Sequence, residues 1–173
     1  MRKNERKAFL ERNSGKRLIL DALIAAVLLF LDQFTKYLAI THLKDQPAIV
    51  LIDGVLELQY LENRGSAFSL LQGQKFIILA IGFAVLAVLI FVIVKLPQNK
   101  KFRIVHILLS ALIAGALGNI IDRLRFDYVV DFISFVLIHF PVFNVADCFI
   151  VVCTISLFLL FMFVYKEDDL KFL

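Results

Sequence analysis

The segment FIILAIGFAVLAVLIFVIV at residues 76–94 decides the fold class of this chain. It has 19 residues and no charged side chain, and a helix needs about 20 apolar residues to span the hydrocarbon core of a bilayer. A surface helix of a soluble protein would instead repeat its apolar residues with the helical period. The segment therefore predicts a transmembrane helix.

Three further apolar segments, at 18–40, 104–124 and 145–165, have similar lengths. Hydrophobic residues make up 61% of the 173-residue chain, and a soluble domain of this size cannot bury that much apolar surface. The sequence predicts a single, mainly α-helical membrane domain with four spans. The first segment could be a cleaved signal peptide, but no small-residue cleavage site follows it, which favours a retained span.

Positive charges predict the orientation of the chain in the membrane. The extension 1–17 contains seven Lys and Arg, and the tip KLPQNKKFR at 95–103 contains four. The connection 41–75 contains only three in 35 residues. A basic run can bind nucleic acid, but beside an apolar span it marks the cytoplasmic side. We expect no nucleic-acid partner, both termini in the cytoplasm, and outward-facing connections at 41–75 and 123–144.

The first outer connection has the pattern of a small β-structure. AIVLIDGVLELQYL (48–61) has two β-rich arms around Asp53-Gly54, which is typical of a hairpin with a two-residue turn. NRGSAFSLL (63–71) then predicts a turn and a short helix. We expect residues 45–74 to form a β-sheet and a short helix at the outer membrane surface.

Two groups of polar residues lie in or beside the predicted spans, where polarity is costly. Asp32 and Lys36 are spaced i, i+4 and can pair on one helix face, as a structural ion pair or with Lys36 reaching the interface. Asn119, Asp122 and Arg123 share another face. A packing face that ends in an Asp122–Arg123 pair is one interpretation, but it leaves the Asn119 amide without an explanation.

A pair of carboxylates flanks the connection between the third and fourth predicted spans. Asp131 and Asp147 lie near the start and at the end of an almost wholly apolar stretch, VVDFISFVLIHFPVFNVAD at residues 129–147. Asn144 could simply cap the last helix, with Asp147 in its first turn. Two carboxylates that come close cannot both ionise cheaply, so they share a proton, as in aspartic proteolysis.

The sequence offers no other set of catalytic residues that is as complete as this pair of carboxylates. The three histidines are scattered and no H-E-x-x-H motif is present, so we expect neither a metal nor a cofactor. Cys148 and Cys153 lack metal-ligand or disulfide spacing and are interpreted as small apolar residues. Ser66 and Ser69 have no obvious base, although the sequence leaves Lys36 and Lys75 open as bases.

Five ordered blocks carry a resemblance to a known family. They are DQFTK (32–36), NRGSAFS (63–69), GALGNIIDR (115–123), VVDF (129–132) and FNVAD (143–147). In their order and spacing they resemble the lipoprotein signal peptidases (signal peptidase II) of bacteria. The resemblance covers nearly all of the chain after residue 17, and the basic extension lies outside it.

The resemblance implies an intramembrane aspartic endopeptidase of the bacterial cytoplasmic membrane. Its substrate would be a prolipoprotein that carries diacylglycerol on a cysteine, cut just before that cysteine near the outer face. The implied fold has four transmembrane helices, an outer β-cradle and a short surface helix. Membrane lipid would be its other partner, and we expect it to act as a monomer.

The same resemblance implies roles for individual residues. Asp131 and Asp147 would be the catalytic pair. The substrate-binding and supporting residues would be Asn63, Gly65, Ala67, Asn119, Asp122, Arg123, Asn144, Asp32 and Lys36. The connection between the two aspartates is compact here, which would alter a flap over the site and leave the chemistry unchanged.

Two alternatives from other classes remain open at this point. A small proton-coupled transporter could use Asp32, Asp122, Asp131 and Asp147 as a relay. Transporters place such groups near the midplane and often show an internal repeat, whereas here the carboxylates lie toward one side and no repeat is visible. A structural membrane subunit would use polar residues only to hold helices together, which leaves the paired Asn-x-x-Asp spacings unexplained. Cleavage of a lipidated substrate would discriminate among the three.

Overall fold

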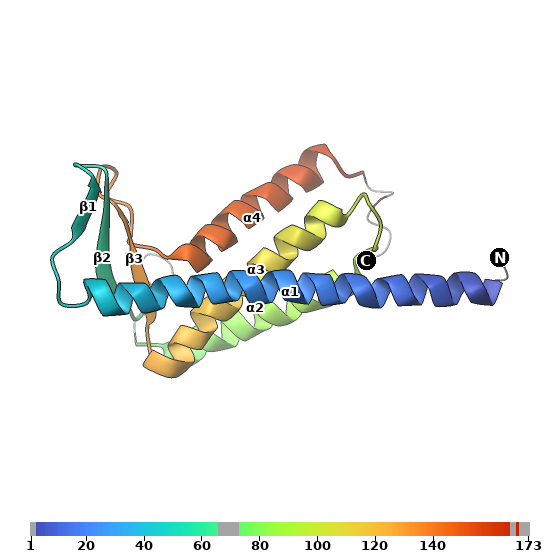
Figure 1. The fold of residues 1–173 in the computed structure, drawn as a ribbon, viewed down its shortest axis with the longest axis horizontal. Helices are drawn as coiled ribbons and strands as arrows, with labels where there is room; N and C mark the ends of the chain where they lie inside the picture. Colours follow the sequence, from blue (N-terminus) through green and yellow to red (C-terminus); the bar gives the residue numbers. More distant parts are fainter. Residues whose placement is uncertain (1–2, 66–72, 167–168, 170–173) are drawn as a thin grey trace.

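The computed structural model describes residues 3–65, 73–166 and 169, with side chains from residue 15 onward. Figure 1 shows four helices and a small sheet at one end of the bundle. In chain order the elements are α1 (Lys3–Leu43), β1 (Ile49–Ile52), β2 (Leu56–Asn63), α2 (Lys75–Lys95), α3 (Arg103–Phe126), β3 (Val129–Phe135) and α4 (Val145–Phe163).

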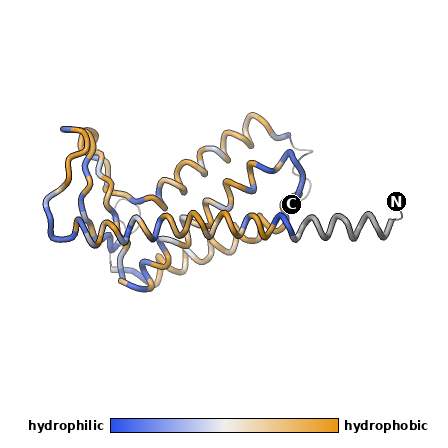
Figure 2. The backbone as a smooth tube through the Cα atoms, viewed as in Figure 1, coloured by the Kyte–Doolittle hydropathy of each residue, from blue (hydrophilic) through white to orange (hydrophobic). Residues whose placement is uncertain are grey.

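Four of these helical stretches are long and apolar enough to cross a membrane: Gly15–Leu43, Lys75–Lys95, Arg103–Phe126 and Val145–Phe163. The prediction of four spans is therefore confirmed. Figure 2 shows apolar residues along the helices and hydrophilic ones mainly at their ends. Large apolar side chains face outward on these helices, with Phe76 84% and Phe163 77% exposed. Such exposure suits lipid, because acyl chains solvate these side chains as well as a protein core does.

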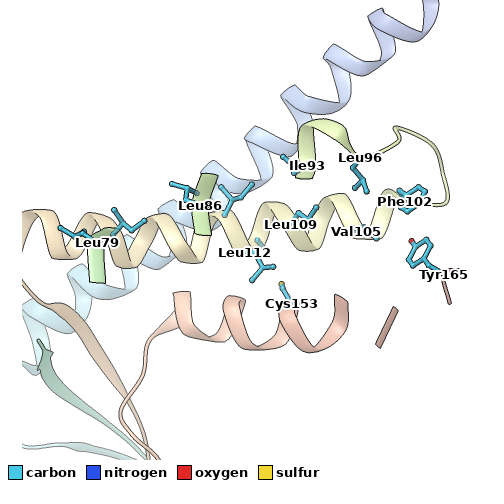
Figure 3. Packing of buried hydrophobic residues seen from close by; sticks show 13 residues of the cluster. Leu79, Leu86, Ile93, Leu96, Phe102, Val105, Leu109, Leu112, Cys153 and Tyr165 are labelled. Carbon is cyan, nitrogen blue, oxygen red and sulfur yellow. The ribbon is translucent and has the colours of Figure 1, made fainter. Parts of the chain in front are cut away.

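Helix α3 lies at the centre of the bundle and contacts each of the other three helices. Leu79, Leu86 and Ile93 of α2 belong to one buried cluster with Leu109 and Leu112 of α3, and Figure 3 shows Leu112 on the side of α3 toward Cys153 of α4. Cys153 of α4 is buried in the same cluster, in agreement with its interpretation as an apolar residue.

Two glycines of α3 allow its neighbours to approach closely. A Cβ atom on Gly115 would lie 2.7 Å from the backbone oxygen of Ala146 in α4. A Cβ atom on Gly118 would collide with the Asp32 carboxylate of α1. The side of α3 that carries Gly115 and Gly118 is thus the side on which α4 and α1 pack closely.

The sheet is antiparallel, with the strand order β1-β2-β3. The predicted hairpin is present, and Val55 N–H donates to Ile52 C=O at 3.0 Å across Asp53-Gly54. Because Ile52 pairs with Leu56, Val55 also belongs to the connection, which has three residues instead of two. Strand β3 was not predicted as a strand. The predicted short helix at 63–71 falls mostly on residues 66–72, which lie outside the described residues.

The sheet has two different faces. One face carries Leu58 and Val130 and packs against Ala39 and Leu43 at the end of α1. This contact fixes the sheet across the end of the helix bundle, as Figure 1 shows. The opposite face, with Asn63 and its neighbours at alternate positions, borders a cavity.

Candidate active site

A cavity of about 1120 Å³ lies between this second sheet face, the end of α3 and the start of α4. The residues 136–143 form another wall. Carboxylate and amide side chains gather at one end of the cavity, namely those of Asp131, Asp147, Asn63 and Asn119. Most of the remaining wall is apolar.

Strand alternation places Asp131 in this cavity. On β3, Val130 and Phe132 face α1, so Asp131 between them faces the opposite side. The residue is only 1% exposed. Both of its carboxylate oxygens accept hydrogen bonds from side-chain amides, Oδ2 from Asn63 at 2.8 Å and Oδ1 from Asn144 at 2.6 Å.

A bulge in β3 brings the start of α4 to Asp131. The backbone N–H groups of Phe132 and Ile133 both donate to the carbonyl oxygen of Phe143, at 3.0 and 2.8 Å. Two residues of β3 thus oppose one residue of the returning chain, which is the pattern of a β-bulge. Because Phe143 is held in this way, the next residue, Asn144, lies beside Asp131.

Asp147 is positioned by the first turn of α4. Its backbone N–H donates to Asn144 Oδ1 at 3.0 Å, and its Oδ2 accepts from the backbone N–H of Asn144 at 3.2 Å, which is a capping box. Its Oδ1 accepts from the Asn119 amide of α3 at 2.8 Å. The helix dipole favours a negative charge at this position.

Asn144 therefore has two roles that the sequence presented as alternatives. It caps α4, as the simpler interpretation predicted, and its amide also donates to Asp131. The residue is fully buried. One side chain thus links the two aspartates.

Asp131 has a strongly perturbed acidity. Burial raises the pKa of its carboxyl group to about 7, and the negative charge of Asp147 acts in the same direction. The Asn63 and Asn144 amides and the charge of Lys36 oppose this rise. A carboxyl group with this pKa can hold a proton at neutral pH, when an ordinary aspartate is ionised.

Behind the two aspartates lies a buried ionic cluster centred on Lys36. Its Nζ atom is 3.0 Å from Asp32 Oδ2, 3.0 Å from Asp122 Oδ2, and donates to Asn119 Oδ1 at 2.9 Å. Gln33 donates to Asp122 Oδ1 at 2.9 Å and to Asp32 Oδ2 at 3.2 Å. Lys36 thus connects to Asp147 through Asn119, and the predicted Asp32–Lys36 pair is present.

Backbone groups connect the same cluster to the rest of the site. Asp32 Oδ1 accepts from the backbone N–H of Ala146 in α4 at 2.9 Å. Asp122 Oδ2 accepts from the backbone N–H of Val130 in β3 at 3.2 Å. The carboxylates of α1 and α3 therefore fix the backbone on each side of the aspartate pair.

One predicted pair is wrong. Asp122 pairs with Lys36 and not with Arg123, because the two adjacent side chains leave the helix in different directions. Arg123 instead donates to the backbone oxygens of Asn119 at 3.1 Å and Gly65 at 2.9 Å. Gly65 N–H in turn donates to Asn63 Oδ1 at 3.0 Å. Ala67, the remaining predicted residue, lies outside the described residues.

Sequence reasoning missed Gln33, although its position beside Asp32 was a signal that it could join that ion pair. It also missed a second buried cluster nearer the start of α1, in which Asp21 lies 2.6 Å from His106 Nδ1 and 3.1 Å from Arg17 Nε. Across the described ranges, no three His, Cys, Asp or Glu side chains form a group that could hold a metal ion.

The lysines considered as bases for a serine have other partners. Lys36 is engaged by two carboxylates. Lys75, at the start of α2, pairs with Asp127 at the end of α3. Ser66 and Ser69 lie outside the described residues.

Comparisons with known proteins agree with this architecture. A family model described as signal peptidase (SPase) II matches residues 24–164. A lipoprotein signal peptidase of Caldanaerobacter subterraneus is 46% identical over 141 residues, covering 81% of this chain and 94% of the relative. One of Clostridium tetani is 38% identical over 152 residues, covering 86% and 94%. A bacterial membrane enzyme solved by the in meso method at 1.9 Å resolution is 30% identical with a TM-score of 0.73, covering 84% of this chain and 94% of that chain.

Proposed function

The chain belongs to the signal peptidase II family, and from that premise we propose that Asp131 and Asp147 are the catalytic pair of an aspartic peptidase. The protein is a multi-pass bacterial membrane peptidase that removes signal peptides from prolipoproteins. The observation that carries the proposal is the pair of buried aspartates in one cavity, linked through Asn144.

Asp131 holds the shared proton in the resting site. Its pKa of about 7 supports this assignment. Asp147, at the N-terminus of α4, is the carboxylate that takes a proton from water. As the water attacks, Asp131 gives its proton to the carbonyl oxygen of the scissile bond. When the intermediate collapses, Asp147 protonates the leaving amine and Asp131 recovers its proton.

The remaining polar residues orient this pair. Asn63, Asn144 and Asn119 direct the carboxylate oxygens through the hydrogen bonds described above. Lys36 donates to Asn119 and forms ion pairs with both Asp32 and Asp122. Arg123 holds Gly65, and with it the end of β2, against α3.

The substrate that fits this arrangement is a prolipoprotein with diacylglycerol on the cysteine that follows the scissile bond. The cavity has a mainly apolar wall from α4, including Ile150 and Val151, which suits acyl chains. The sheet and the aspartates lie at the end of the bundle opposite the basic 95–103 tip (Figure 1), so the site faces outward by the positive-inside rule. Both termini are then cytoplasmic. Water and the lipidated cysteine both have access at that outer interface.

Purified protein incubated with a synthetic diacylated prolipoprotein tests this function. The expected result is release of the signal peptide, followed by mass spectrometry of both products. Asp131→Asn and Asp147→Asn should each lower the rate at least ~10³-fold, and the double variant should be little worse, because residues that act as a unit are not additive. Substantial turnover by either single variant would remove the aspartic mechanism.

The transporter and structural-subunit alternatives have no observation in their favour. The carboxylates of the site are joined in one cluster through Lys36 and Asn119, whereas a proton relay would need such groups at intervals across the whole membrane. The curated relatives described above carry the name of a peptidase.

A further inference from the structure

The cavity continues past the aspartate pair along the sheet. Alternate residues of β2 line it, and Asn63, beside Asp131, is at one end of this row. Glu57 is at the other end, with Leu61 and Gln59 between them. The aspartic mechanism assigns no role to Glu57.

Irregularities in the sheet keep Ser134, the residue of β3 that pairs with Glu57, on the cavity side. Leu61 pairs with Asp131 and Glu57 pairs with Ser134, with a register shift between them. In a regular strand, residues 131 and 134 would face opposite sides. The bulge at Phe132 changes that alternation, so Asp131 and Ser134 both line the cavity.

The register also gives the spacing between the aspartate pair and Glu57. Ser134 is three residues from Asp131 on β3, which corresponds to about 10 Å along the strand. A substrate chain that runs along the sheet in an extended conformation covers the same distance in about three residues. Glu57, beside Ser134, would thus lie next to the third residue after the scissile bond.

Glu57 has no compensating charge. Within the described part of the chain it makes neither an ion pair nor a side-chain hydrogen bond, and it is only partly exposed. The one arginine among the cavity-lining residues, Arg123, already donates to two backbone oxygens. The Asp131–Asp147 pair, which shares one proton, adds one negative charge to the same space. Among the described residues that line the cavity, His139 is the one other basic side chain and no Lys is present, so a Lys or Arg of the substrate would supply a partner for Glu57.

We propose that Glu57 is a specificity-determining residue that favours prolipoproteins with Lys or Arg about three residues after the scissile bond. This inference rests on the proposed function, because it places the mature end of the substrate along the cavity face of β2. The α4 wall is left for the acyl chains.

This inference can be tested with three diacylated prolipoprotein peptides that differ only at that third position, which is Lys, Gln or Glu. The readout is kcat/KM for each peptide. Wild-type protein should cleave the Lys peptide ~3- to 10-fold more efficiently than the Glu peptide, by a contact between partly screened charges. Glu57→Gln should make the three values similar, and Glu57→Lys should reverse their order. Added salt should reduce the wild-type preference.

Glu62→Gln is the matched control, because Glu62 is on the same strand but pairs with Lys44 and Arg64 outside the cavity. It should retain the wild-type preference. Cleavage without a charge preference, or a preference that survives Glu57→Gln, would overturn this inference while leaving the peptidase function intact. An equal loss for all three peptides in Glu57→Gln would also overturn it, since it would indicate a structural role. Failure of wild-type protein to cleave any peptide would instead contradict the proposed function.

Discussion

Asn144 and Asp131 are joined by a 2.6 Å hydrogen bond between the Asn144 amide and Asp131 Oδ1. The same Asn144 side chain caps α4 through its oxygen, 3.0 Å from the backbone nitrogen of Asp147. The bond therefore ties the orientation of one aspartate to the helix terminus that positions the other. We therefore expect stability to depend on the oxygen of this amide group and activity on its nitrogen.

These two hydrogen bonds predict that two substitutions of Asn144 will differ in their effect on stability. Asn144→Ser keeps an oxygen that can cap α4 but loses the amide donor to Asp131, so stability should stay near wild-type while cleavage falls steeply. Asn144→Ala loses both and should cost about 1 kcal/mol more in the free energy of unfolding. Thermal unfolding in detergent and peptide cleavage measure the two effects. Equal stability of the two variants would contradict the capping role.

The pH dependence of cleavage should reflect the shared proton. A carboxyl group loses its proton as the pH rises through its pKa, which is about 7 for Asp131. We expect the rate to fall through that region. Asn63→Ala removes an amide that favours the ionised form, so the fall should move to higher pH. Gln59→Ala, on the same face of β2 but away from Asp131, should leave the profile in place.

The same shift has a consequence for stability. The pKa of Asp131 lies above its ordinary value of 3.8, so between 3.8 and about 7 the folded protein binds more of this proton than the unfolded chain does. The contribution of this group to the free energy of unfolding therefore falls as the pH rises through that window.

Much of this site could be predicted from sequence because its residues lie on helices. The i, i+4 spacing of Asp32 and Lys36 fixes their separation whatever the tertiary packing. Helical spacing likewise placed Asn119 and Asp122 on one side of α3. The four spans follow from length and hydrophobicity alone.

Contacts between residues that are far apart in the sequence could not be predicted from helical spacing. Strand β3 contains Asp131 and has the β-rich composition of a strand, but its alternation is interrupted by the bulge at Phe132. The partner of Asp122 was predicted wrongly because sequence proximity to Arg123 outweighed a lysine 86 positions away. Which cation reaches a carboxylate depends on helix packing, and the glycines of α3 set that packing.

The corrected partner changes what removal of Asp122 should do. Asp122→Ala leaves Lys36 with one buried carboxylate instead of two and removes the acceptor for Val130 N–H. We expect a loss of about 1–3 kcal/mol in the free energy of unfolding, because the buried Val130 N–H is left without an acceptor while Lys36 keeps Asp32. Asp122→Asn keeps an oxygen for the Val130 N–H and should lose less. Unchanged thermal stability and full activity in Asp122→Ala would contradict a supporting role for this residue.

Topology can be tested with single cysteines in a background that lacks Cys148 and Cys153. The cysteine introduced by Asn99→Cys lies in the basic tip between α2 and α3 and should react only with reagents that reach the cytoplasm. One at Gln46→Cys, between α1 and β1, should react with a membrane-impermeant maleimide added to whole cells. Reversed labelling would place the aspartate pair on the cytoplasmic side. Cleavage of the lipidated peptide by the background protein shows that the fold is retained.

Glycine-to-alanine substitutions should separate two kinds of close contact. In Gly118→Ala the new methyl group meets the buried Asp32 carboxylate, which Lys36 and the Ala146 N–H hold in place. Since that carboxylate cannot move without losing both partners, α1 should be displaced from α3, with lower thermal stability and loss of cleavage. In Gly82→Ala the methyl group lies 3.2 Å from Ile120 Cγ1 and 3.3 Å from its Cδ1, so a shift of this side chain by a few tenths of an ångström is enough to accept it.

Gly82→Ala should therefore stay within about 1 kcal/mol of wild-type in the free energy of unfolding, because alanine also favours a helix over glycine. Thermal unfolding in detergent and cleavage of the lipidated peptide should be measured for both variants in parallel. If the two behave alike, the contact between Gly118 and Asp32 does not hold α1 against α3. If only Gly118→Ala loses activity, the position of α1 controls the aspartate pair through Lys36 and Asn119.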